Sequence, residues 1–252
     1  MSHVRWLLLW CWLGSAMGAS IQAVTEELPP YNYRDGNGQV TGLSVDMLHR
    51  MLEVSGVTLD SKGIQLLPWA RAYQMAQYDP NTVIFSMIRL PEREALFHWV
   101  GPIGPRVTWM YRLAARDDVV GRQLTDLVPW RIAVVRDSAL AIELAEKGLN
   151  LVLVHDEDDK FRMLLRGRAD VAPAMQMGAA YHIETLGHRY SEFVPMFQFQ
   201  ETMLFYFAFS RNTDEATIKL LQQAFNQMRN DGSYEEITQK WVRRFWIKPA
   251  SE

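Results

Sequence analysis

The sequence contains a single cysteine, Cys11, which lies in an apolar N-terminal segment. If that segment is removed on export, the mature chain has no disulfide, no thiol catalysis and no zinc–thiolate site. No other apolar run reaches the length of a transmembrane helix. Basic residues are scattered and the formal charge is -3, so we expect no nucleic-acid partner. No phosphate loop, nucleophile elbow or paired metal-ligand spacing occurs, and we expect no cofactor or metal.

Residues 1–19 have the pattern of a secretory signal peptide. Arg5 supplies the positive charge, residues 6–13 form a short apolar run, and small residues follow, with cleavage expected near Gly18 or Ala19. An uncleaved anchor or a buried strand is the alternative. A lipoprotein is disfavoured, because the bulky Trp10 precedes the cysteine.

The rest of the chain alternates apolar runs with segments of helical periodicity. We expect strands at residues 21–24, 83–87, 107–113, 131–135, 150–154, 169–174 and 204–209, and another ending at Leu66 and Leu67. We expect one helix capped by Ser44 and a second that starts at Pro68. Further helices are expected at 139–147, after Asp137 or Ser138, and around 161–165. Two more are separated by Gly232. This alternation predicts an α/β protein with covered sheets.

Polar clusters along the chain have simple structural interpretations. The acidic residues 156–159 precede a helix and favour interaction with its dipole over a calcium site, because they lack alternating oxygen ligands. His182 and His188 lie six residues apart, off the helical repeat, and we expect both at the surface.

Five short motifs occur in an order that resembles a known family. They are Pro29-Pro30-Tyr31, Gly42-Leu43-Ser44-Val45-Asp46, Pro91-Glu92-Arg93 with Phe97 and Gly101-Pro102, Gly167-Arg168-Ala169-Asp170, and Asp231-Gly232-Ser233-Tyr234 with Ile237 and Trp241. Together they resemble the family-3 extracellular solute-binding proteins, the periplasmic receptors of polar amino-acid ABC transporters.

The resemblance implies a two-lobed periplasmic-binding-protein fold (type II), in which each lobe has a central sheet with flanking helices. Lobe 1 would comprise residues 20–102 and 206–252, lobe 2 residues 108–200, and the hinge crossovers residues 103–107 and 201–205. It also implies a periplasmic, monomeric protein that closes around a small-molecule ligand and docks on an ABC permease.

The resemblance also implies a set of ligand-binding residues. Arg93 matches the family arginine that binds the ligand carboxylate, and a guanidinium suits that bidentate contact. The neighbouring Arg89 faces either the cleft or solvent. The remaining expected contacts are Trp69 as an aromatic wall, Glu27 or Leu28 on the opposite wall, Ser86 and Ile88 at a strand end, and Ser138 and Arg136 at a helix start in lobe 2.

Met175 is the largest departure from the family pattern, because the family usually has an aspartate there that binds the ligand ammonium. A buried ammonium without a partner costs several kcal/mol. Either Glu26, Glu27 or Gln176 replaces the aspartate, or the ligand has no α-amino group, and Met175 itself contacts an apolar part of it.

Three roles are compatible with this pattern. The leading hypothesis is a binding protein, not an enzyme, that delivers a small carboxylate-bearing solute, an amino acid or related compound, to a transporter. A dehydratase-like enzyme on the same fold is the first alternative, since His155, Glu157, Glu26 and Glu27 offer possible acids. A ligand-sensing partner of a membrane receptor is the second.

Overall fold

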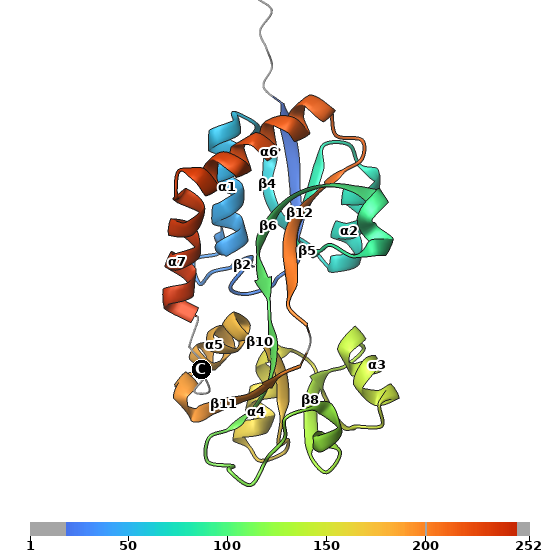
Figure 1. The fold of residues 1–252 in the computed structure, drawn as a ribbon, viewed down its shortest axis with the longest axis vertical. Coiled ribbons are helices and arrows are strands. Elements are labelled where there is room, and N and C mark those ends of the chain that lie inside the picture. Colours follow the sequence, from blue (N-terminus) through green and yellow to red (C-terminus); the bar gives the residue numbers. More distant parts are fainter. Residues whose placement is uncertain (1–18, 200, 246–252) are drawn as a thin grey trace, which may run out of the picture.

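The computed structural model describes residues 19–199 and 201–245 and consists of two halves stacked along the long axis (Figure 1). Residues 1–18 of the predicted signal peptide lie outside the described residues. Each half has its own sheet and its own buried cluster of apolar side chains. The expectation of an α/β fold with covered sheets is confirmed.

The upper half is built on a five-stranded sheet of order β4-β1-β5-β12-β6. Its strands are β1 (Ser20–Thr25), β4 (Thr58–Leu66), β5 (Thr82–Ile88), β6 (Phe97–Arg106) and β12 (Met203–Ser210). β1 is parallel to β4 and β5, whereas β12 is antiparallel to β5 and β6. The helices are α1 (Leu43–Ser55), α2 (Trp69–Tyr78), α6 (Glu215–Asn230) and α7 (Ser233–Phe245), and a short ribbon pairs β2 (Tyr33–Arg34) with β3 (Val40–Thr41).

The lower half contains an antiparallel sheet of order β10-β7-β11 and a parallel pair, β8-β9. Its strands are β7 (Thr108–Leu113), β8 (Arg131–Val135), β9 (Asn150–Val154), β10 (Ala172–Met175) and β11 (Phe193–Gln198). Its helices are α3 (Ala139–Glu146), α4 (Glu157–Leu165) and α5 (Gln176–Thr185), with single turns η2 (Leu124–Leu127) and η3 (Tyr190–Glu192). A bridge between Ile132 and Val171 joins β8 to the chain just before β10.

The chain crosses between the halves in a paired ribbon. β6 runs out of the upper sheet towards β7, and β12 returns beside it, as Figure 1 shows. The two strands stay paired to the end of β6, across a register shift between Phe205 and Phe207, with Arg106 opposite Met203 and Gly104 opposite Phe205. Backbone hydrogen bonds therefore hold the two connections to each other as well as to their sheets.

The structure corrects several expectations about elements. Strand β6, Phe97–Arg106, is absent from the expected strands, and Ser44 does not cap α1, whose N-cap is Gly42. β10 spans Ala172–Met175, later than expected, and β11 and α5 have no counterpart in the expected set. Ser138, one of the two expected candidates, caps α3 through the backbone N–H of Ala141. Asp156 caps α4 through the N–H of Asp159, and the other acidic residues, 157–159, lie in the first turn of this helix and not before it.

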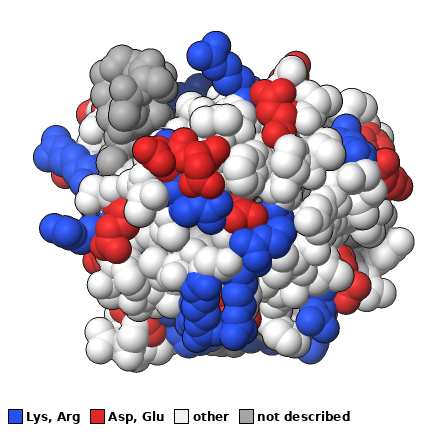
Figure 2. Space-filling model, turned by 90° about the horizontal axis from the view of Figure 1, so that it is seen from below, with Lys and Arg blue, Asp and Glu red and all other residues white. Residues whose placement is uncertain are grey.

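Asp170 joins the parts of the lower half. Its carboxylate accepts hydrogen bonds from the backbone N–H and guanidinium of Arg131 at 2.9–3.0 Å and from Arg116 Nη1 at 2.9 Å. These contacts, Arg131 first, lower the pKa of Asp170 to about 2. Figure 2 views this end of the molecule, where basic side chains lie beside acidic ones. The family-like motif ending in Asp170 therefore has a structural role.

We expect Asp170→Asn to lower the free energy of unfolding by about 1–2 kcal/mol at pH 7, because the ionised carboxylate holds both arginines. This stability is present above the unfolded-state pKa near 3.8 and is lost as the pH falls towards 2. Urea unfolding between pH 3 and 7 should show the two proteins converging at the acid end. Asp118→Asn is the matched control, since Asp118 pairs with Arg116 at an exposed position. An equal effect of both substitutions would contradict the role of Asp170.

Candidate functional site

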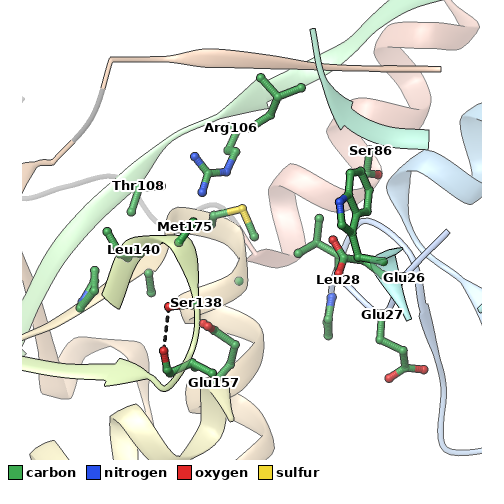
Figure 3. A pocket seen from close by; sticks show the side chains of 18 of the residues that line it. Glu26, Glu27, Leu28, Ser86, Arg106, Thr108, Ser138, Leu140, Glu157 and Met175 are labelled. Atoms are coloured by element: carbon green, nitrogen blue, oxygen red, sulfur yellow. Dashed lines mark hydrogen bonds between the residues drawn. The ribbon is translucent and has the colours of Figure 1, made fainter. Parts of the chain in front are cut away.

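A cavity of about 500 Å³ lies where the two halves meet. Its size is within the range of small-molecule sites. Figure 3 shows Ser86, Leu28, Glu26 and Glu27 on one side and Thr108, Leu140, Ser138, Glu157 and Met175 on the other, with Arg106 reaching between them. Other lining residues are Trp69, Ile88, Arg93, Val134, Lys160, Gly178, His182 and Phe205. In the described part of the chain, no three side chains of His, Cys, Asp or Glu cluster as a metal site.

The wall that carries Glu26 and Leu28 is held by the side-chain amide of Asn32, which is fully buried. Asn32 Nδ2 donates to the backbone carbonyl of Glu26 at 2.6 Å and to Thr25 Oγ1 at 3.0 Å. Thr25 Oγ1 in turn donates to the carbonyl of Phe85 on β5, at 3.1 Å. The loop after β1 is thus fixed to the neighbouring strand from within.

The same amide fixes the direction of hydrogen bonds at Ser86. Since Nδ2 of Asn32 faces the carbonyl of Glu26, its Oδ1 faces Ser86 and accepts the proton of that hydroxyl. Ser44 Oγ, 2.7 Å from Ser86 Oγ, must then be the donor of that pair. Ser86 lines the cavity with φ 55°, and its hydroxyl has a lone pair but no proton left for a ligand.

Helix α1 also depends on this loop. The backbone N–H groups of Leu43 and Ser44 donate to the carbonyls of Pro30 and Tyr31 at 3.0 and 2.9 Å. These bonds satisfy helix donors that a capping side chain would otherwise bind. The start of the helix lies so close to this loop that position 42 must be glycine, because a Cβ on Gly42 would lie 2.2 Å from the backbone carbonyl oxygen of Tyr31.

Arg93 lies on the turn η1 (Pro91–Leu96) and lines the cavity, as the sequence predicts. Its guanidinium carbon is 5.8 Å from the ring centroid of Trp69 and 5.5 Å from that of Tyr73. Within the described residues, its hydrogen bond is a long one, 3.5 Å from Nη1 to the carbonyl of Ile88. The aromatic faces hold the cation in place and leave most of its N–H donors for a ligand.

Arg89 has a different environment. Its guanidinium forms a two-point contact with the Glu94 carboxylate, with Nε 2.7 Å from Oε2, and lies against the rings of Trp99 and Tyr206. It borders a separate groove, away from the cavity. Glu94 is therefore the partner of Arg89, and not of Arg93.

The other predicted contacts divide into two groups. Seven of them line the cavity: Glu27, Leu28, Trp69, Ser86, Ile88, Ser138 and Met175. Arg136 is exposed and is not among the lining residues. Ser138 already donates to the carbonyl of Val135 at 2.7 Å and accepts from the N–H of Ala141, so its hydroxyl proton is also committed.

Sequence reasoning missed three basic or titratable side chains of the cavity. Arg106 ends strand β6, and Lys160 is buried on α4, with Nζ 2.6 Å from the carbonyl of Pro173 and 2.6 Å from Glu157 Oε2. His182 was expected at the surface, but its side chain is 12% exposed, lines the cavity and contacts Asp158 at 2.7 Å. Of these three residues, Arg106 is the one that the sequence could have indicated, because it lies in the expected crossover at residues 103–107, next to the cleft.

Glu26 is the carboxylate in this cavity that stands without a partner among the described residues. Burial raises its pKa to about 6, and no charge or hydrogen bond to the carboxylate offsets that burial. Glu27 is exposed, and its Oε1 accepts from the backbone N–H of Arg34 at 3.1 Å. Gln176 is buried but does not line the cavity. Of the three acidic or amide residues considered as replacements for the family aspartate, Glu26 is the one placed to meet a cationic group.

Residues 21–244 match the family described as bacterial extracellular solute-binding proteins, family 3. The match spans both halves and all the lining residues, and the chain belongs to this family. The sequence has no match among curated proteins.

Solved structures share the fold at low sequence identity. A histidine kinase sensor domain with similarity to periplasmic binding proteins has a TM-score of 0.73 and 23% identity, covering 89% of this chain and 96% of that one. A probable amino-acid ABC transporter extracellular-binding protein, ytmK from Bacillus subtilis, has a TM-score of 0.75 and 16% identity, and the match covers 89% of this chain and 98% of that one. The P235GK mutant of ArgBP from T. maritima has a TM-score of 0.71 and 19% identity, and the match covers 89% of this chain and 96% of that one. The likeness confirms the periplasmic-binding-protein fold expected from the sequence.

We expect Glu26→Gln to stabilise the ligand-free protein above pH 7 by up to about 2 kcal/mol, because it removes a buried charge. The raised pKa means that the wild-type protein loses stability as the pH rises from about 4.5 through about 6. Thermal unfolding should show the two proteins coinciding below pH 4.5 and separating above it. A variant less stable than wild type at pH 8 would show that the carboxylate has a stabilising partner.

Proposed function

We propose that this protein binds a small carboxylate-bearing solute in the cavity between its halves, in the periplasm, and delivers it to an ABC permease. The observation that carries the proposal is the position of Arg93, whose guanidinium lines the cavity with donors to spare. Membership of the solute-binding family supports binding, and not catalysis, as the role of the cavity.

The available donors favour guanidinium recognition of the carboxylate. Ser86 and Ser138 both have their hydroxyl protons committed within the protein, and Ile88 has no hydroxyl. A carboxylate entering the cavity therefore finds its strongest donor in Arg93. A guanidinium binds a carboxylate through two parallel, charge-assisted hydrogen bonds, which give both affinity and orientation.

We propose that Glu26, in the upper half, receives the ammonium of ligands that have one. Met175 occupies the cavity wall of the lower half and can contact only an apolar part of the ligand. An ammonium beside Glu26 would offset the burial of that carboxylate and pair two charges that are each costly when alone.

We also propose that binding closes the two lobes, residues 20–102 with 206–252 and residues 108–200, about the crossovers at 103–107 and 201–205. The paired strands β6 and β12 support this hinge, since they are the connection between the halves (Figure 1). The protein would act as a monomer, because each copy has its own complete cavity.

We expect Arg93→Ala to reduce the affinity for every carboxylate ligand at least 100-fold, since a charge-assisted two-point contact is lost. A panel of amino acids and of mono- and dicarboxylates, screened by thermal shift, would identify a bound compound for calorimetry. Arg89→Ala is the matched control, because Arg89 lies four residues away with its guanidinium outside the cavity. Unchanged affinity in Arg93→Ala, or equal losses in both variants, would remove the central claim.

We expect Glu26→Gln to weaken amino-carboxylates about tenfold or more while leaving their deaminated counterparts unchanged or tighter. Calorimetry with compound pairs such as 5-aminopentanoate and pentanoate makes the comparison. If both members of every pair that binds respond alike, Glu26 is not the ammonium partner.

A further inference from the structure

We infer that one face of helix α5 holds the two halves together and thereby sets the affinity for every ligand of the cavity without touching any of them. This face, which we call the α5 contact, consists of Met177, Ala180, Tyr181 and Glu184. The inference rests on the proposed function and deepens it, because it concerns the regulation of the same cavity.

Helix α5 faces three different surroundings. An α-helix repeats every 3.6 residues, so residues three or four apart share a face. The cavity is lined by Gly178 and His182, the core of the lower half contains Ala179 and Ile183, and the apolar cluster of the upper half includes Met177, Ala180 and Tyr181. One short helix therefore borders the ligand cavity and both halves at once.

The α5 contact is closely packed. Met177 and Ala180 lie on a helix of the lower half, yet they are 3% and 6% exposed within the apolar cluster of the upper half. The helix also lies close to the loop after β1, since a Cβ added to Gly178 would be 3.5 Å from the carbonyl oxygen of Pro29. Separation of the halves at this point would return apolar side chains to water, which is unfavourable in proportion to the area exposed.

Tyr181 joins α5 to two elements of the upper half. Its ring centroid lies 5.0 Å from that of Tyr33, on β2, and 5.8 Å from that of Phe245, on α7. Aromatic pairs at such distances stabilise beyond the area that they bury. Glu184 and Arg244 lie 3.9 Å apart beside these rings, but both are exposed, so the ion pair contributes little. The contact therefore depends chiefly on the ring of Tyr181.

The α5 contact lies apart from the paired ribbon of β6 and β12. Figure 1 shows α5 and α7 on one side of the molecule and α2 and α3 on the other, with the ribbon between them. The contact can therefore restrict a separation of the halves that the ribbon alone would permit. Its free energy belongs to the arrangement in which the two cavity walls face each other, and not to either half alone.

The contact has a consequence for affinity. A ligand that contacts both walls binds the closed arrangement, and its apparent affinity is proportional to the fraction of molecules in that arrangement. Loss of the contact lowers this fraction, so every ligand is weakened by the same factor and selectivity is unchanged. Loss of a residue that touches the ligand would instead weaken some compounds more than others. Tyr181 is thus a positioning residue.

The first test measures the separation of the halves without any ligand. Spin labels are attached at Gln74→Cys on α2 and Glu146→Cys on α3, two exposed positions, one in each half, and Cys11→Ser removes the single native cysteine. The distance between the labels is measured by electron paramagnetic resonance. We expect Tyr181→Ala to increase the mean distance relative to the parent protein.

Two controls accompany this measurement. Tyr181→Phe keeps the ring, and Phe193→Leu loses a ring contact with Phe161 that lies wholly within the lower half. Both should leave the label distance unchanged. An unchanged distance in Tyr181→Ala, or an equal increase in Phe193→Leu, would overturn the inference, whatever the protein binds.

The second test measures affinity by calorimetry for each compound that the thermal-shift panel identifies. We expect Tyr181→Ala to weaken all of them by one common factor of about 5–30, since two aromatic contacts are lost, and Tyr181→Phe to bind as the wild type does. Unchanged affinities, or a loss confined to some compounds, would also overturn the inference. If no compound binds the wild-type protein, the proposed function fails, whereas the label distances still decide whether the α5 contact holds the halves together.

Discussion

The side-chain amide of Asn32 is the constraint on which the binding wall of the upper half depends. It is fully buried, and its three hydrogen bonds reach Thr25 at the end of β1, the carbonyl of Glu26 and Ser86 on β5. Ser86 in turn is bonded to Ser44 at the start of α1. The Glu26 carbonyl only accepts, which fixes the orientation of the Asn32 amide, and the direction of the bonds at Ser86 and Ser44 follows from it. Leaving any of these buried groups unpaired would cost about 1–3 kcal/mol. The network therefore fixes both the positions of the wall residues and the polarity that Ser86 presents to a ligand.

This polarity explains why the cavity relies on charged side chains. The two serines at its margins satisfy backbone and side-chain groups of the protein itself, as Ser138 does at the start of α3. In the proposed function, recognition of an anion is then left to Arg93, whose guanidinium lies against the rings of Trp69 and Tyr73.

The sequence was sufficient to predict the fold class and the location of Arg93, because both depend on local patterns. Apolar periodicity identified α6, on which Leu221, Phe225 and Met228 are buried, and the family-like motif identified the turn that carries Arg93. It failed for β6, which contains two glycines and two prolines and forms a strand through its pairing with β12. It also failed for α5, because this helix is buried on several sides and so lacks a polar face.

Site residues that depend on distant contacts could not be predicted in the same way. Lys160 follows an acidic stretch that is typical of a solvated helix start, and its burial depends on the carbonyl of Pro173, on another element, as well as on Glu157. Thr108 is an ordinary strand threonine in the sequence, and only the assembled structure shows that it lies beside the cavity. Such features belong to the assembled cavity and leave no trace in local spacing.

Helix α5 of the lower half touches the upper half at a point remote from the ribbon. The ring of Tyr181 lies 5.0 Å from that of Tyr33 and 5.8 Å from that of Phe245, on α7. These ring contacts join the halves on the side of α5 and α7, whereas α2 and α3 begin at the cavity on the other side, at Trp69 and Ala139 (Figure 1). If the halves rotate as proposed and the ring contacts persist, the cavity opens on the side of Trp69 and Ser138.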